Sequence, residues 1–126
     1  MAGTWVYVRK ENGDGQALSR ARWCDSVLCR LRGLTFRRPL DEREGLILVE
    51  PVESRMGTSI HMFGVFFPLG VVWINSQGMV VDTCIARPWR LYFPKAPARF
   101  VLEASPDLID HVQPGDFLEF VDEESA

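Results

Sequence analysis

The chain has few of the residues that build metal, redox and disulfide sites. It holds three cysteines, no CxxC pair and no histidine pair at the spacing of metal ligands. Cys24 and Cys29 are five positions apart in a segment of helical character, and on one helix they would point about 140° away from each other. We therefore expect reduced thiols, no metal and no cofactor, with Cys84 as a small core residue.

Long apolar runs are also absent. The most apolar stretch, SIHMFGVFFPLGVVWIN at 59–75, is interrupted by Gly64, Pro68 and Gly70, and it falls short of the 18 or so apolar residues that a spanning helix needs. We therefore predict no membrane span. The opening residues MAGTWVYVRKENGDG contain no apolar leader segment, so we expect a cytoplasmic protein.

The amino-acid composition is otherwise that of an ordinary globular protein, but the charged residues are unevenly distributed along the chain. Apolar residues make up 47% and charged residues 25%, and 126 residues fit one domain, 1–126, with an acidic tail at 122–126. Residues 1–38 hold eight basic and three acidic side chains, whereas residues 101–126 hold eight acidic and no basic ones. Either the two ends attract each other and the tail aids solubility, or the polarity orients the chain on an anionic partner.

Turn residues recur every 8 to 12 positions, which is typical of β proteins. We predict a mainly β fold, a small antiparallel barrel or sandwich with one or two short helices. Strands are expected at 4–8, 16–23, 45–51, 58–63, 69–75, 79–86, 100–104 and 114–121, and helices at 24–34 and 105–112.

Local signals set several of these boundaries. Asp25 or Ser26 can cap the first helix and Gly33 can end it, while Pro51 should stop the third strand. Ser105, followed by proline, should cap the second helix. The sequence VVWINSQGMVVDTCI predicts a hairpin that turns at NSQG.

Several spaced segments resemble a known family. RLRGLTFRRPL, EGLILV, SIHMFGVFFPLGVVWIN, ARP and VLEA follow in order the pattern of family number 192 of the domain-of-unknown-function series, over about residues 17–121. The resemblance implies a compact, mainly β domain and brings no established activity. Gly70 stands where relatives usually carry an aspartate. If that aspartate has a chemical role, this chain lacks it; if it only orders a turn, glycine can replace it.

Catalytic motifs are missing. There is no GxSxG motif, no phosphate-binding loop and no acidic pair at metal spacing. His61 could act as a general base with Glu103, but a strand would place His61 and Phe63 on one face and the apolar Ile60 and Met62 on the other. A histidine with a structural hydrogen bond is the competing interpretation.

Arginines offer a second candidate site. Arg32 and Arg87 lie within the family-like segments, and with Glu103 they could hold a small anionic or polar ligand. The competing interpretation is a structural ion pair of either arginine with Glu103.

The segment ARPWRLYFPKAPARF interleaves basic and aromatic residues, among them Arg87, Trp89 and Tyr92. Single-stranded nucleic acids and protein partners both use such surfaces, but a sequence pI near 5.4 argues against nucleic acid. A rigid loop over the core is the structural alternative.

We therefore interpret the chain as a small non-catalytic binding or accessory module. Its ligand-binding candidates are Arg32, Arg87, Trp89 and Tyr92, and its partner would be a protein, a peptide or a small anion. The alternatives are a hydrolase- or lyase-like enzyme using His61 with Glu103 and the arginines, and a purely structural subunit.

Overall fold

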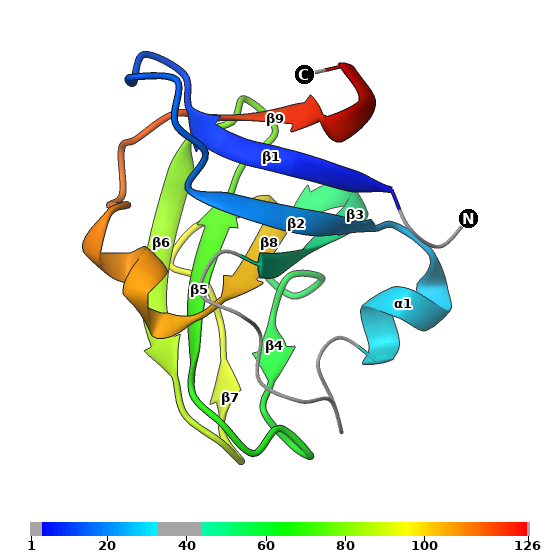
Figure 1. The fold of residues 1–126 in the computed structure, drawn as a ribbon. Helices are drawn as coiled ribbons and strands as arrows, with labels where there is room; N and C mark the ends of the chain where they lie inside the picture. Colours follow the sequence, from blue (N-terminus) through cyan, green and yellow to red (C-terminus); the bar gives the residue numbers. More distant parts are fainter. Residues whose placement is uncertain (1–3, 33–43, 126) are drawn as a thin grey trace.

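The computed structural model describes residues 4–32 and 44–125, with the side chains of residues 31, 32 and 125 excluded. The expected mainly β fold is confirmed, with one short α-helix and two 3₁₀ turns (Figure 1). The elements are β1 Trp5–Lys10, β2 Ser19–Cys24, α1 Val27–Arg32, β3 Glu44–Ser54, β4 Ile60–His61, β5 Leu69–Ile74, β6 Val80–Ala86, β7 Leu91–Tyr92, β8 Ala98–Ala104, η1 Pro106–Asp110, β9 Leu118–Asp122 and η2 Glu123–Ser125.

Seven of the strands form one curled sheet in the order β6-β5-β8-β3-β2-β1-β9. The two outer strands approach each other at one end, where Met79 forms a bridge with Phe117. There the Val80 N–H donates to the Asp116 carbonyl over 2.8 Å, and the Leu118 N–H donates to the Gly78 carbonyl over 2.8 Å. The sheet is therefore a half-barrel closed at one end.

One strand pair departs from the expected antiparallel arrangement. β2 and β3 run parallel, with Ala21 opposite Gly45, whereas the other pairs of the sheet are antiparallel. Parallel neighbours need a crossover connection rather than a tight turn. The connection from β2 to β3 contains α1, which meets that need.

The central strands are buried on both faces. All six residues of β5 are buried, and they alternate between two apolar clusters. Val72 and Ile74 point into the half-barrel, in what we call the inner core. Leu69, Val71 and Trp73 point to the other side, in what we call the outer core. A sheet that is apolar on both faces requires a cover on each of them.

Two long loops cover the outer core. Residues 55–68 supply Ile60, Met62 and Val65 to it. The indole N–H of the buried Trp73 donates to the Thr58 carbonyl over 2.7 Å, which fastens this loop to the sheet. The second loop, 87–97, contributes the half-buried Tyr92. The apolar stretch at 59–75 thus supplies both part of the covering loop and the buried strand β5 that the loop covers.

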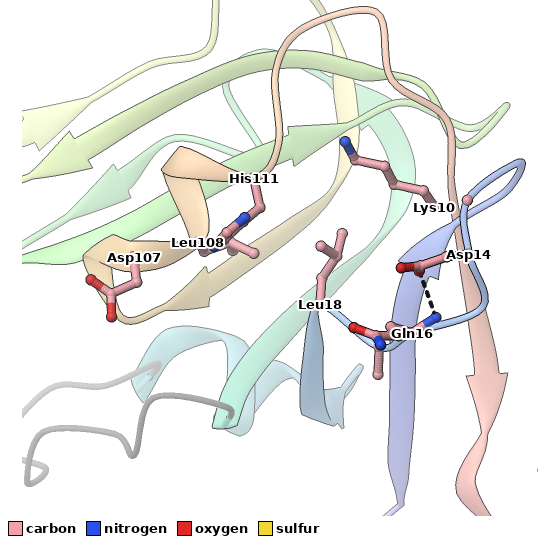
Figure 2. A pocket seen from close by; sticks show the side chains of 9 residues that line it. Lys10, Asp14, Gln16, Leu18, Asp107, Leu108 and His111 are labelled. Carbon is pink, nitrogen blue, oxygen red and sulfur yellow. Dashed lines mark hydrogen bonds between the residues drawn. The ribbon is translucent and has the colours of Figure 1, made fainter.

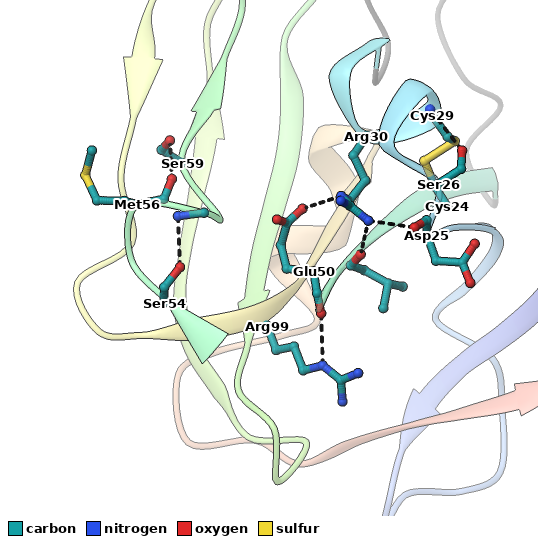
Figure 3. A network of polar contacts seen from close by, with 12 residues as sticks. Cys24, Asp25, Ser26, Cys29, Arg30, Glu50, Ser54, Met56, Ser59 and Arg99 are labelled. Atoms are coloured by element: carbon teal, nitrogen blue, oxygen red, sulfur yellow. Dashed lines mark hydrogen bonds and ion pairs between the residues drawn. A yellow bond between two sulfur atoms is a disulfide. The ribbon is translucent and has the colours of Figure 1, made fainter. Parts of the chain in front are cut away.

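The prediction of reduced thiols is wrong for two of the three cysteines. Cys24 and Cys29 form a disulfide, and Cys84 is free. The expected angle of about 140° between the two side chains applies only if both cysteines lie on one helix. Instead, Cys24 is the last residue of β2 and only Cys29 lies in α1. Ser26 caps the helix as expected, since its hydroxyl accepts the Cys29 N–H over 3.1 Å (Figure 3).

A polar network holds this short helix against the sheet (Figure 3). The Arg30 guanidinium lies 3.0 Å from the Glu50 carboxylate and donates to the Asp25 carbonyl. The Arg99 guanidinium donates to the Glu50 carbonyl over 3.0 Å. Because α1 has only six residues, these tertiary contacts rather than intrinsic helix propensity stabilise it.

Other boundaries differ from expectation or lie outside the described residues. β3 continues through Pro51, because its pairing with β8 is irregular between Val49 and Ser54 and needs no amide donor there. Ser105 precedes a 3₁₀ helix and makes no side-chain capping hydrogen bond. The expected helix end at Gly33 lies outside the described residues. Within the described ranges, no helix is long and apolar enough to cross a membrane.

The backbone of η1 explains why glycine occupies position 70. A Cβ atom there would lie 2.7 Å from the Ser105 carbonyl oxygen and 3.3 Å from the Pro106 Cα. η1 can therefore lie directly on β5 only because residue 70 has no side chain. An aspartate at this position would need the backbone at 105–106 to move.

We predict that Gly70→Ala lowers the free energy of unfolding by about 2 kcal/mol, because the new methyl group meets backbone that cannot rotate away. Urea denaturation measures this. Gly57→Ala is the control, since its Cβ would lie 2.7 Å from the Ser54 hydroxyl, which can turn aside. Equal losses in the two variants would contradict the close approach of η1.

Candidate functional site

The two covering loops are joined to each other by a small ribbon. β4 and β7 pair antiparallel, with Ile60 opposite Tyr92 and His61 opposite Leu91. Beyond the ribbon, the Met62 N–H donates to the Arg90 carbonyl over 2.7 Å. The Trp89 N–H donates to the Met62 carbonyl over 2.9 Å. Figure 1 shows this ribbon at the bottom of the molecule, with β1 and β9 at the top.

The ribbon turns apolar residues inward and aromatic residues outward. Ile60 and Met62 are buried, as the expected strand pattern requires, whereas His61 and Phe63 are exposed. Trp89 is also on the outward side, with 57% of its surface exposed. Backbone pairing therefore presents aromatic side chains from two distant segments on one side of the loops.

These side chains form one cluster, which we call the aromatic surface: His61, Phe63, Phe66 and Trp89. The His61 ring stacks on Phe63 with centroids 5.5 Å apart. The Trp89 ring lies 6.5 Å from Phe63 and 5.7 Å from Phe66, the latter edge to face. The rings contact one another while Phe66 and Trp89 stay more than half exposed.

The backbone of Trp89 has an unusual conformation. Its φ is 65°, and it is the one non-glycine residue with positive φ in the described part of the chain. Such a conformation costs an L-residue roughly 1–2 kcal/mol, because Cβ approaches the following carbonyl. Bulky residues in this region concentrate at functional sites. Here it aims the indole at Phe63 and Phe66.

Tyr92 lies beneath this surface. Its ring packs against the outer core, and its hydroxyl accepts the Arg87 N–H over 2.8 Å. This bond closes the tight loop that carries Trp89. Arg87 itself is exposed. The structure thus brings Arg87, Trp89 and Tyr92 together, with Tyr92 as a support. The side chain of Arg32, on α1, lies outside the described residues.

Glu103 is not part of this arrangement. It lies on β8 between Leu46 of β3 and Val71 of β5, and only 5% of its surface is exposed. Burial raises the pKa of Glu103 to about 7. Among the described residues, no hydrogen bond or ion pair joins it to His61 or Arg87. The predicted acid–base pair of His61 and Glu103 stays a prediction, and the expected Arg87–Glu103 ion pair is not formed.

The free thiol is also a poor nucleophile. Burial, with a smaller contribution from Asp82, raises the pKa of Cys84 to about 11. The thiolate is the reactive form, so Cys84 is unreactive near neutral pH. Within residues 4–32 and 44–125, no three histidine, cysteine or acidic residues cluster at metal-binding distance.

A separate pocket of about 850 Å³ lies between the β1–β2 turn and η1 (Figure 2). Lys10 and Asp14 face Asp107 and His111 across it, with Leu18 and Leu108 between them. The Lys10 ammonium lies 3.5 Å from the Asp116 carboxylate. Sequence reasoning missed this pocket because no motif joins the two segments. Its mixed charges and largely exposed walls do not select one class of ligand.

We predict that Trp89→Gly is more stable to unfolding than Trp89→Ala by about 1 kcal/mol, because only glycine adopts positive φ without strain. Both variants lose the indole contacts equally. At the exposed Met56, where φ is not positive, the glycine variant should instead be the less stable of the pair. Urea denaturation of the four variants provides the test. If the glycine variant were more stable than the alanine variant at both positions, or less stable at both, backbone strain at Trp89 would be contradicted.

We predict that the buried Glu103 makes the stability of the protein to unfolding depend on pH. The pKa of Glu103 in the folded protein lies above the ordinary 4.5. The contribution of Glu103 to the free energy of unfolding is therefore complete below pH 4.5 and is lost as the pH rises through about 7. The loss amounts to about 3 kcal/mol. The difference in unfolding free energy between wild type and Glu103→Gln should change across this window. Glu119→Gln, on the partly exposed Glu119, is the control. Parallel pH profiles for wild type and Glu103→Gln would refute the burial effect.

Several solved proteins share this fold. A putative transcription regulator from Sinorhizobium meliloti superimposes with a TM-score of 0.80 at 21% identity, over 93% of this chain and 92% of its own. A protein of unknown function from Novosphingobium aromaticivorans gives 0.74 at 21% identity, over 94% and 84%. Identities this low establish the fold alone.

Curated relatives are closer in sequence. A UPF0127 protein of Pyrococcus furiosus is 38% identical over 101 residues, covering 79% of this chain and 84% of its own. One from Pyrococcus horikoshii is 37% identical over 93 residues, covering 74% and 78%. The model of the family DUF192, described as "Uncharacterized ACR", matches residues 8–120. The chain therefore belongs to this uncharacterised family, as its spaced motifs indicated.

Proposed function

We propose that the protein is a non-catalytic binding module that holds a protein or peptide partner on its aromatic surface. The observation that carries this proposal is the contact of Trp89 with Phe63 and Phe66, all largely exposed, on loops locked by backbone hydrogen bonds. Rigid, clustered aromatic residues are the typical anchors of protein interfaces.

The shape of the surface favours a macromolecular partner. Small ligands bind in concave sites that enclose most of their area. Phe66 is 63% exposed and Trp89 57%, so rings this open would enclose little of a small molecule. A peptide or protein face can cover several rings at once, and the rigid ribbon loses little conformational entropy in the process.

Two observations weigh against the enzyme alternative. His61 stacks on Phe63 at the surface, whereas Glu103 is buried on β8. The Cys84 thiol has a pKa too high for nucleophilic attack near neutral pH. Among the described residues, no hydrogen bond joins a hydroxyl or thiol to a histidine, the pairing that is typical of nucleophilic hydrolases.

The cytoplasmic location remains a proposal. The Cys24–Cys29 disulfide weighs against it, because disulfides persist mainly in oxidising compartments.

We predict that peptides selected from a displayed random library on the wild-type protein bind Trp89→Ala about 30-fold more weakly, because an aromatic anchor contributes about 2 kcal/mol. Fluorescence anisotropy with labelled peptides measures the affinities. Phe117→Ala removes another exposed aromatic residue, next to β9, and should leave binding unchanged. Selected peptides that bind Trp89→Ala as tightly as the wild type would overturn the proposal, and so would a selection that yields no binder.

A further inference from the structure

The two loops that carry the aromatic surface are purely cationic. Residues 55–68 and 87–97 contain four basic side chains and no acidic one: Arg55, Arg87, Arg90 and Lys95. The whole chain has a net charge of −3, so the rest of it carries −7. An acidic protein thus concentrates positive charge around its exposed aromatic rings.

The two cations next to Trp89 in the sequence, Arg87 and Arg90, have no acidic partner among the residues that the structure describes. Four described basic residues elsewhere form ion pairs: Arg9 with Glu119, Lys10 with Asp116, Arg20 with Glu123 and Arg30 with Glu50. Arg87 and Arg90 are exposed and form no ion pair with any described residue. Their charges, on either side of Trp89, are available to a partner.

Resting on the proposed function, we propose that the partner segment is an acidic peptide with an apolar anchor. The anchor side chain packs against the rings of Phe63, Phe66 and Trp89. Aspartate or glutamate residues beside the anchor meet the guanidinium groups of Arg87 and Arg90, which match carboxylates in planar, paired hydrogen bonds. Charge complementarity of this kind mainly raises the association rate and the specificity.

The arrangement of the rings favours a peptide over a single-stranded nucleic acid. Bases need ring faces that are free for stacking. Trp89 instead meets Phe66 edge to face, at 73°, and the His61 ring already stacks on Phe63. The charge of −7 on the rest of the chain would also repel a long polyphosphate, whereas a short acidic segment contacts only the cationic loops.

A second copy of this chain is a weaker candidate. Its acidic C-terminal part is the complementary surface, but four of the eight carboxylates there are already engaged. Asp116, Glu119 and Glu123 form ion pairs with Lys10, Arg9 and Arg20, and Glu103 is buried. We therefore favour an acidic segment from another protein.

Three synthetic peptides test this proposal. Each has a central tryptophan, flanked only by glutamate in the first, by glutamine in the second and by lysine in the third, and a single-stranded oligothymidine serves as the polyanion control. At about 50 mM salt, where charges act over more than 10 Å, the glutamate peptide should bind wild type about tenfold more tightly than the glutamine peptide, and the lysine peptide most weakly.

Matched charge variants locate the contact. Arg87→Gln with Arg90→Gln should weaken the glutamate peptide about tenfold and the glutamine peptide less than about twofold. Arg9→Gln with Lys10→Gln removes the same charge on β1 and should change either affinity less than about twofold. Both double variants leave backbone hydrogen bonds intact, including the Arg87 N–H to Tyr92.

The outcomes separate this inference from the proposed function. If Trp89→Ala abolishes binding of all three peptides and their charge makes no difference, the binding module stands and the acidic partner is wrong. If charge matters and Trp89→Ala has no effect, the aromatic anchor is wrong. Tighter binding of oligothymidine than of the glutamate peptide, no binding of any peptide, or equal losses in the two double variants would also overturn the inference.

Discussion

The structure depends on one constraint: the central strands of the sheet are apolar on both faces. β5 alternates between the inner core and the outer core without one exposed position. The half-barrel buries the first face by curling, but the second face needs other segments. The loops 55–68 and 87–97 meet this need, and the hydrogen bond from the Trp73 indole to the Thr58 carbonyl fastens the first of them to the sheet.

The candidate surface is a consequence of this cover. Because Ile60 and Met62 must point into the outer core, the pleat of the ribbon turns His61 and Phe63 outward. The hydrogen bonds that join Met62 to Trp89 and Arg90 then bring the second loop beside the first. One set of backbone contacts therefore seals the core and gathers the aromatic residues.

Local sequence patterns predicted much of this fold but not its long-range pairings. The hairpin of β5 and β6 follows from two apolar runs joined by the turn residues at 75–78, and the outward orientation of His61 follows from the strand period. The parallel pairing of β2 with β3 has no local signature, because it depends on where a crossover returns the chain. The disulfide was missed because the strand ends at Cys24, inside the segment assigned to a helix.

The candidate site was predicted in part, for the same reason. Trp89, Arg87 and Tyr92 stood out as aromatic and basic residues close together in sequence, and the structure keeps them together. Phe66 was not predicted, because only the pairing between two distant loops brings it to Trp89. Glu103 appeared to be a site residue because it is charged, yet its position on a central strand buries it. Residue type indicated chemistry, but topology decided which residues meet.

Three unfavourable features coincide at this surface, and their coincidence is the strongest argument for a partner. Exposed aromatic rings that contact one another leave apolar area in water. Trp89 adopts a backbone conformation that costs free energy. Among the described residues, Arg87 and Arg90 lack acidic partners such as those of Arg9, Arg20 and Arg30. Each feature alone is ordinary on a protein surface. A bound acidic segment with an apolar anchor would cover the rings, neutralise the cations and use the strained loop as a rigid platform.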